Sequence, residues 1–243
     1  MPALQKMPEI HLDEEELKQL GLRWEPTSKS LPKADGEKAG KLCDSNIAKA
    51  MAKMLGDIEI KSPLSSKALI PPHEDCVELG STTIIGGIRS QMFDICYRPD
   101  GVRIAYDNKS LNSKSSVGKN YRNMINDLGT EAATVHSRFP FAVVSFVVIL
   151  PEPCLEEPHL TGLMSALVRL NNRSSENDHA HKAEVISLVL WDPTSGKINK
   201  NYPKKDTGLH LSSYSEKIYE NYFLRYRGMA PHLDTEIQEE EVS

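Results

Sequence analysis

The stretch "FDICYRPDGVRIAYDNKS", residues 93–110, decides the fold expected for this chain because it is the most strand-like hairpin in the sequence. Two apolar runs flank Asp100-Gly101, a dipeptide typical of two-residue hairpin turns in which both residues have positive φ. If these two residues form the loop, Ile95 faces Tyr106 across the hairpin. This register sorts the large apolar side chains of both strands to one face, namely Phe93, Ile95, Tyr97, Ile104 and Tyr106.

The other face of the hairpin carries charged side chains. Asp94 lies directly opposite Asp107, and Lys109 follows on the same side, two residues further along the strand. Adjacent carboxylates repel each other, and one pKa rises unless a cation lies between them. Mg²⁺ or Mn²⁺ suits such hard oxygen ligands, and the backbone carbonyl of Asn108 adds another. The sequence therefore predicts a metal site at which Lys109 stabilises phosphate charge, or orients or deprotonates a water.

Two other interpretations of the hairpin stay open. A type I turn with a bulge pairs Asp94 with Tyr106 and moves the two acids apart. Alternatively, the acids and Lys109 are surface groups of an edge strand, where charged side chains are common. Neither alternative provides a site for chemistry.

The composition places the chain among ordinary globular proteins. It carries a formal net charge of −5, with 39% hydrophobic and 26% charged residues, so a strongly basic nucleic-acid binder and a disordered chain are both disfavoured. A local basic surface remains compatible with DNA binding. The four cysteines lack a C-x-x-C pair, so we expect reduced thiols and no zinc site. Because the sequence shows neither a signal peptide nor an apolar run of roughly 18 residues, we expect a cytoplasmic protein that does not enter the membrane.

Apolar periodicity predicts an α/β fold with a central mixed β-sheet flanked by helices. From residue 44 onward, the expected order is a helix, three strands, a helix, a strand, a helix, a strand and a helix. Asp44 is expected to cap the helix at 44–55. Ser213 and Glu216 have the spacing of a capping box at the start of the last helix.

The chain is expected to form a single domain at residues 41–230. Residues 1–40 are polar and interrupted by prolines, which favours an N-terminal arm or extension. Residues 231–243 are expected to be an acidic, flexible tail.

This order of features resembles the core of the PD-(D/E)XK nuclease superfamily, and within it the type II restriction endonucleases. In that pattern an acid on one strand precedes a D/E-x-K motif on the next, and a helix and a buried strand follow. Asp94 matches the first acid, Asp107 the second acid and Lys109 the lysine. The helix and the buried strand match residues 117–137 and 139–150, so the resemblance covers under a third of the chain.

One position departs from the family pattern, because Phe93 stands where a proline usually precedes the first acid. The letters "RPD" at 98–100 contain that proline, but Asp100 belongs to the expected turn. A second E-x-K, formed by Glu59 and Lys61, resembles the acidic strand of some repair and restriction nucleases. Its other interpretation is a short amphipathic strand with the isoleucines inward and the charges outward.

The resemblance implies hydrolysis of phosphodiester bonds in double-stranded DNA, with Mg²⁺ as the cofactor, Mn²⁺ as a substitute and 5′-phosphates on the products. Asp94, Asp107 and Lys109 would be catalytic, and Asp94, Asp107 and Asn108 would bind the metal. A homodimer is implied because the targets of the family are palindromic. Two polar loops offer side chains for phosphates and base edges: Lys114, Lys119, Arg122, Asn172, Arg173, Asn177, His179 and Lys182.

Two other functions stay open at this point. The chain is alternatively a repair or recombination nuclease with the same fold. It is also compatible with a non-catalytic DNA-binding or scaffold protein, in which the acids are surface groups. Glu78, on the preceding strand, is expected either as a surface residue or as an extra acid near the site.

Overall fold

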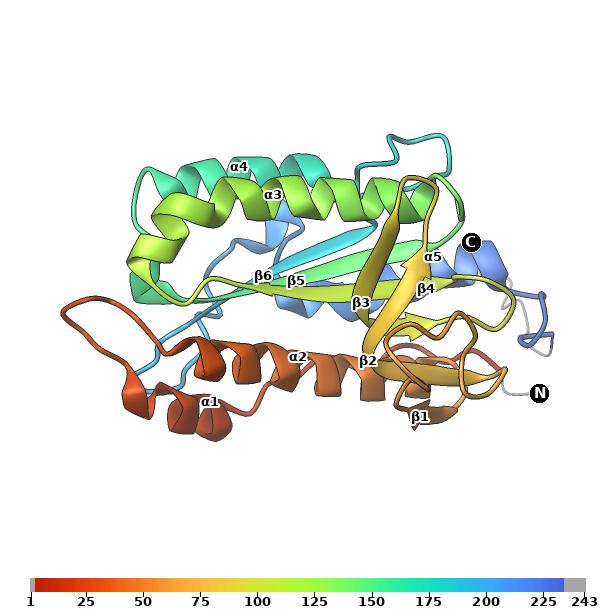
Figure 1. Cartoon of the computed structure of the whole chain (residues 1–243), viewed down its shortest axis with the longest axis horizontal. Coiled ribbons are helices and arrows are strands. Elements are labelled where there is room, and N and C mark those ends of the chain that lie inside the picture. The colour runs from red at the N-terminus through yellow and green to blue at the C-terminus, as the bar shows by residue number, and fades with distance from the viewer. Residues whose placement is uncertain (1–2, 234–243) are drawn as a thin grey trace, which may run out of the picture.

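A computed structural model describes residues 3–233, and its centre is a six-stranded mixed β-sheet (Figure 1). The strands are β1 (Glu59–Lys61), β2 (Cys76–Ile85), β3 (Ser90–Tyr97), β4 (Ile104–Ser110), β5 (Val143–Pro151) and β6 (Val185–Trp191). Their order across the sheet follows their order in the sequence. β2, β3 and β4 form an antiparallel meander, whereas the pairs β1–β2, β4–β5 and β5–β6 are parallel.

Helices cover both faces of this sheet. The α-helices of the described residues are α1 (Glu14–Leu20), α2 (Lys33–Met54), α3 (Lys114–His136), α4 (His159–Leu170) and α5 (Tyr214–Tyr226). α3 and α4 pack on one face, and α2 and α5 on the other, with α1 beside α2 (Figure 1). The predicted α/β class with a central mixed sheet is therefore confirmed.

The strands next to the predicted site are fully covered. Every residue of β5 and β6 is buried, because helices lie over both faces of the sheet at these positions. A parallel strand that is covered on both sides reads as a continuous apolar run, and "VVSFVVILP" is such a run. β5 thus holds β4 in place from one side, while β3 holds it from the other.

The hairpin of β3 and β4 has the predicted register but a different loop. Ile95 pairs with Tyr106, and the pairing continues to Tyr97 and Ile104. Gly101 has φ 129°, but Asp100 does not share a positive φ, so the loop is not the expected turn type. Instead, the Arg103 guanidinium donates to both Asp100 carboxylate oxygens, at 2.8 and 2.5 Å, and this ion pair closes the loop.

Phe93 lies on the opposite face of the sheet from the one predicted, next to a bulge in the pairing of β2 with β3. Leu79 pairs with Ile95 and Thr82 with Phe93, so two residues of β2 lie opposite Asp94 alone. The shift turns Phe93 to the α3 side of the sheet, whereas Ile95 faces α2. Bulges re-aim side chains next to functional sites, and this one lies beside the first predicted acid.

The first 40 residues pack against the same core as the predicted domain at 41–230. Leu4, Met7, Ile10 and Leu12 are each less than a tenth exposed and join the core cluster beneath α2. Residues 3–40 therefore do not extend from the domain as the expected arm. Within residues 3–233, no helix combines the length and the apolarity that crossing a membrane requires.

Several expected chain features lie elsewhere. α2 begins at Lys33, so Asp44 is an interior residue of a 22-residue helix and not its cap. Ser213 precedes α5 without a capping hydrogen bond from its side chain, so the expected capping box does not form. Of the expected tail at 231–243, residues 234–243 lie outside the described residues, and His232 is fully buried.

Candidate active site

The predicted hairpin residues meet in a cleft of about 750 Å³ beside the C-terminal half of β4. Asp94 enters it from β3, and Asp107 and Lys109 enter it from β4. The remaining wall consists of α2 and the bulged part of β2. The lining residues are Glu37, Lys41, Asp44, Leu79, Gly80, Ser81, Asp94, Asp107, Asn108, Lys109 and Ser110.

Asp94 extends the β3–β4 ladder with its side chain. Backbone pairing of the two strands ends at Ile95 and Tyr106, and the Asp94 carboxylate then accepts the backbone N–H of Asn108 at 3.2 Å. The side-chain amide of Asn108 donates to the same oxygen at 2.8 Å and to both carboxylate oxygens of Asp44, at 2.9 and 3.1 Å. Asn108 therefore bridges an acid of β3 and an acid of α2.

Lys109 lies between two carboxylates on the α3 side of β4. Its ammonium group contacts Asp107 and donates to Oε1 of Glu131 at 2.8 Å. Gln91 donates to the same Glu131 oxygen at 3.0 Å. Among residues 3–233, the second oxygen of Glu131 is buried without a hydrogen-bond partner. Lys109 is thus fixed from both the sheet and the helix.

Burial sets the electrostatics of this cleft. Burial and a hydrogen bond with Asp94 raise the pKa of Asp107, although the nearby Lys109 opposes the rise. Burial and the charge of Asp94 likewise raise the pKa of Asp44 to about 8. Burial alone lowers the pKa of Lys109, but Asp107 and Glu131 outweigh it and raise that pKa. Asp107 and Asp44 are therefore costly to ionise, and the Lys109 ammonium group holds its proton.

Close packing of α2 against the end of β4 builds the bridge at Asn108. A Cβ at Gly40 would lie 2.3 Å from Oδ1 of Asn108, and a Cβ at Gly36 would lie 2.0 Å from the Asn112 side chain. Only glycine leaves room for these two amides at successive turns of the helix. Asp44, one turn further along, then reaches Asn108.

The donor set fits a hard divalent cation. Asp94 and Asp107 supply carboxylate oxygens, and the two acids share one hydrogen bond where a cation would relieve their repulsion. In the described part of the chain, no three histidine, cysteine, aspartate or glutamate side chains are grouped so as to bind a metal ion. Mg²⁺ commonly takes one or two carboxylates and completes its shell with water and substrate phosphate, so a two-carboxylate site suits it better than a transition metal.

The first group of predicted DNA-binding residues lies on a helix and not on a loop. Lys114, Lys119 and Arg122 belong to the first turns of α3, and all three are exposed. Lys114 already pairs with Glu156 at 2.6 Å. Arg122 lies over the ring of Tyr121, with its guanidinium carbon 5.5 Å from the ring centre.

The second predicted group lies away from the cleft. Residues 172–182 lead into the N-terminal end of β6, whereas the cleft lies at the C-terminal half of the parallel strand β4 (Figure 1). Arg173 is 2% exposed and donates to Glu184 at 2.8 Å, so its charge is used in the core and is not presented to a ligand. Asn172 accepts from Lys217 at 2.7 Å. Asn177 and His179 are exposed, and Lys182 is half-buried.

The alternative E-x-K lies on the sheet edge. Lys61 pairs with Glu59 at 2.9 Å, and the Glu59 side chain is 68% exposed. Ile58 and Ile60 pack against the core, which is the amphipathic arrangement. Glu78 is neither a surface residue nor part of the cleft, because it is fully buried and bonds both oxygens to Arg98, at 2.6 and 2.7 Å.

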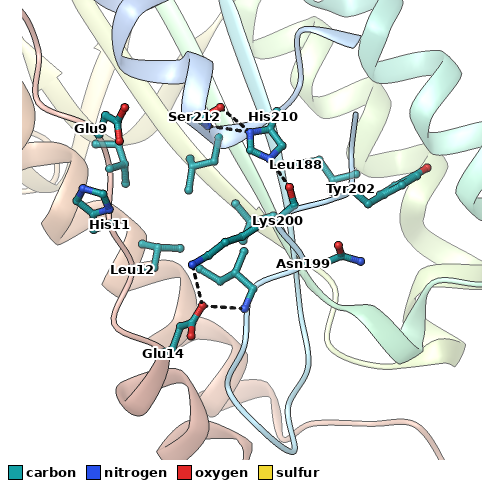
Figure 2. Close-up of a pocket in the computed structure, with 14 residues that line it drawn as sticks. Glu9, His11, Leu12, Glu14, Leu188, Asn199, Lys200, Tyr202, His210 and Ser212 are labelled. Atoms are coloured by element: carbon teal, nitrogen blue, oxygen red, sulfur yellow. Dashed lines mark hydrogen bonds and ion pairs between the residues drawn. The ribbon is translucent and has the colours of Figure 1, made fainter. Parts of the chain in front are cut away.

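A second cavity, of about 350 Å³, lies between the N-terminal segment and the loop after β6 (Figure 2). Some of its polar groups bond one another. Glu14 accepts the backbone N–H of Ile198 at 3.4 Å and lies 3.8 Å from the Lys200 ammonium. One ring nitrogen of His210 bonds the Lys200 carbonyl at 3.0 Å, and the other bonds Ser212. The cavity lies where two chain segments pack together, and among the described residues its acids, Glu9 and Glu14, share no hydrogen-bonded partner of the kind that Asn108 provides in the cleft on β4.

The sequence analysis did not identify Asp44, which lines the cleft, or Glu131, which binds Lys109 from the α3 side. Both carried a detectable signal, since each is an acid on the buried stripe of its helix. Glu131 follows Met124 and Leu128 at helical spacing, and Asp44 precedes Ile47. Comparisons of the chain with protein-family models, with curated proteins and with solved structures give no match.

Proposed function

We propose that this chain is a Mg²⁺-dependent endonuclease of the PD-(D/E)XK kind, which hydrolyses phosphodiester bonds in double-stranded DNA and leaves 5′-phosphates, as type II restriction enzymes do. The observation that carries the proposal is the meeting of Asp94, Asp107 and Lys109 in one open cleft. Surface acids of an edge strand would be solvated separately, whereas Asp107 is 8% exposed and contacts both of the others.

The order of elements supports the same proposal. The acids lie on neighbouring antiparallel strands, α3 follows, and β5 returns parallel to β4 with every residue buried. This is the sequence of strand, strand, helix and strand on which the resemblance was based. A non-catalytic scaffold has no need to bury two acids beside a lysine, because burial of ionisable groups is costly.

The residues that would hold the ion are Asp94, Asp107 and the backbone carbonyl of Asn108, with Mn²⁺ able to replace Mg²⁺. A bound ion would polarise phosphate oxygens and lower the pKa of a water molecule. The chain itself fixes the acid on β3, because Asn108 donates two hydrogen bonds to Asp94. The orientation of that carboxylate is thus set before any ligand arrives, as preorganised sites require.

Lys109 acts in this proposal as a cation and not as a base. Two carboxylates surround its ammonium group and raise its pKa, so it keeps its proton at neutral pH. A protonated lysine stabilises the negative charge that develops on the phosphate and orients the attacking water. Glu131 supports that role by holding the ammonium group toward the cleft from the side of α3.

A homodimer is part of the proposal. A palindromic site presents two equivalent phosphodiester bonds, and a two-fold symmetric dimer places one cleft at each. The cleft of a single chain contains only one Asp94, Asp107 and Lys109 group.

Incubation with plasmid DNA and Mg²⁺ tests the proposal. We expect discrete fragments from the wild type, and no cleavage by Asp94→Ala or by Lys109→Ala with the fold intact by circular dichroism. The matched controls are Asp206→Ala and Lys205→Ala, which remove the same charges at exposed positions after β6. Structure-specific nicking in place of discrete fragments would favour a repair nuclease. Full cleavage activity in either cleft variant would contradict the proposal. A second contradicting outcome is a wild type that binds DNA without cutting it, with an affinity that Asp107→Ala leaves unchanged in the presence and absence of metal.

A further inference from the structure

The outer face of α2 carries a row of lysines that begins at the cleft. Lys38, Lys41, Lys49 and Lys53 follow one another at steps of three or four residues, with Ser45 filling the remaining position. Residues at this spacing share one face of a helix. We name these four residues the α2 lysine row, and all of them are exposed.

The α2 lysine row forms no salt bridges within the described residues. Within residues 3–233, none of its four ammonium groups makes an ion pair, although Lys33 on the same helix pairs with Glu37 at 3.6 Å. Acids flank the row on two sides: Asp44, whose charge interacts with that of Lys41, lines the cleft, and Asp13 and Glu16 line a groove of about 460 Å³ beside α1. Asp13 is occupied there by capping α1, since it accepts two backbone N–H groups. The row is therefore a strip of positive charge on a chain with a net charge of −5.

The strip is continuous with the cleft. Lys41 lines the groove beside α1 and also lines the cleft that holds Asp94 and Asp107. Lys49 and Lys53 lie two and three helical turns further from that point. With a rise of 1.5 Å per residue, Lys38 and Lys53 are about 22 Å apart along the helix. This length equals about six base-pair steps of B-form DNA.

We propose that the α2 lysine row binds the phosphate backbone of double-stranded DNA and guides the duplex into the cleft. The proposal rests on the proposed nuclease function for the identity of the partner. A polyanion with regularly spaced charges suits a row of ammonium groups that make no salt bridges, since neutralising phosphates releases counterions. Lysine contacts of this kind fix the position of a duplex and carry no sequence information. The acids at Asp13 and Glu16 repel the backbone from α1 and confine it to α2.

Fluorescence anisotropy with a 20-base-pair duplex tests this surface. The full chain is titrated in EDTA, so that DNA is bound but not cut, and the titration is repeated from low to high salt. The test variant replaces Lys38, Lys49 and Lys53 with glutamine, which removes three charges and retains helix propensity. It leaves out Lys41, which borders the cleft. The control variant replaces Lys197, Lys204 and Lys205 with glutamine on the exposed loops after β6.

We expect the test variant to bind at least about tenfold more weakly at moderate salt, and the salt slope to fall by roughly one for each lost contact. The control variant should bind as the wild type does. Unchanged affinity and slope in the test variant, an equal loss in the control, or no duplex binding by the wild type would overturn the proposal. The two proposals fail separately. If DNA binding depends on the α2 lysine row but the wild type cleaves no DNA, the nuclease proposal is rejected. If cleavage depends on Asp94 but the lysine variant binds DNA as the wild type does, the proposal for the α2 lysine row is rejected.

Discussion

Lys109 shows how the cleft handles charge at the scale of single residues. Asp107 and Glu131 contact the same ammonium group, so each carboxylate lowers the cost of burying the lysine. Removing one partner leaves the other charges buried with less compensation. Replacing one acid at a time therefore separates an effect on activity, tested at Glu131, from an effect on stability, tested at Asp44.

Neutralising Glu131 should shift the pH profile of cleavage. Glu131→Gln keeps the shape of the side chain and removes the charge that helps to raise the pKa of Lys109. We expect the alkaline limb of the profile to move to lower pH, because Lys109 would lose its proton sooner. Initial cleavage rates at a series of pH values measure the shift. Asp206→Asn, at an exposed position after β6, is the control and should leave the profile near that of the wild type. An unchanged profile in Glu131→Gln would show that this acid does not act through Lys109.

Neutralising Asp44 should change how stability depends on pH. Its pKa rises from an ordinary 3.8 to about 8 on folding, so the folded chain holds a proton that the unfolded chain has lost between those values. The stability of the wild type therefore falls as pH rises from about 4 to about 8. Asp44→Asn lacks this dependence, and we expect it to gain stability relative to the wild type, on the order of 5 kcal/mol, between pH 4 and pH 9. Urea unfolding in EDTA at both pH values measures the gain. Equal differences at the two pH values would contradict the assigned ionisation.

At the scale of elements, the approach of α2 to the end of β4 depends on glycine. Gly40→Ala places a methyl group 2.3 Å from the Asn108 amide, which must then leave Asp44 and Asp94. We expect cleavage to fall at least about tenfold and stability to fall by about 1 to 3 kcal/mol. Gly129→Ala on α3 is the contrasting control, because its Cβ would lie 3.5 Å from the nearest atom. That variant should gain about 0.5 to 1 kcal/mol from helix propensity. Normal activity in Gly40→Ala would show that the Asn108 bridge is dispensable.

The elements also show which sequence signals were sufficient. Residues 117–137 and 141–150 have strong apolar patterns, and α3 and β5 lie there. The start of α2 was not predicted, because "KADGEKAGKLC" at 33–43 has no wide apolar stripe and contains two glycines. Those glycines serve a tertiary contact, which overrides helix propensity and is invisible in a local window. The bulge opposite Asp94 was missed for the same reason, since it depends on how β2 meets β3.

At the scale of the whole molecule, the N-terminal segment is the largest difference from expectation. Its apolar residues Leu4, Met7, Ile10 and Leu12 are separated by polar residues and prolines, without the period of a helix or a strand. A segment without regular structure buries apolar side chains only if the rest of the fold provides a surface, and here α2 and the sheet provide it. In contrast, the placement of Asp107 and Lys109 on one side of β4 was predictable from strand alternation, and the predicted pairing of Ile95 with Tyr106 brings Asp94 beside them.

Metal binding should couple the cleft to the stability of the whole molecule. The cleft contains four carboxyl groups and two lysines, and the raised pKa values of Asp44 and Asp107 mean that protons partly occupy the place of a cation. Mg²⁺ requires ionised ligands, so its binding should release protons and tighten as pH rises. We expect Mg²⁺ to raise the melting temperature of the wild type, more at pH 8.5 than at pH 6.5, because a ligand that binds only the folded state stabilises it. Calorimetric titration in two buffers of different ionisation enthalpy counts the released protons. The double variant Asp94→Asn, Asp107→Asn should lose both the stabilisation and the proton release, whereas Asp206→Asn should retain them. If Mg²⁺ stabilised the double variant and the wild type equally, the ion would bind elsewhere, and no cation would offset the repulsion between Asp94 and Asp107.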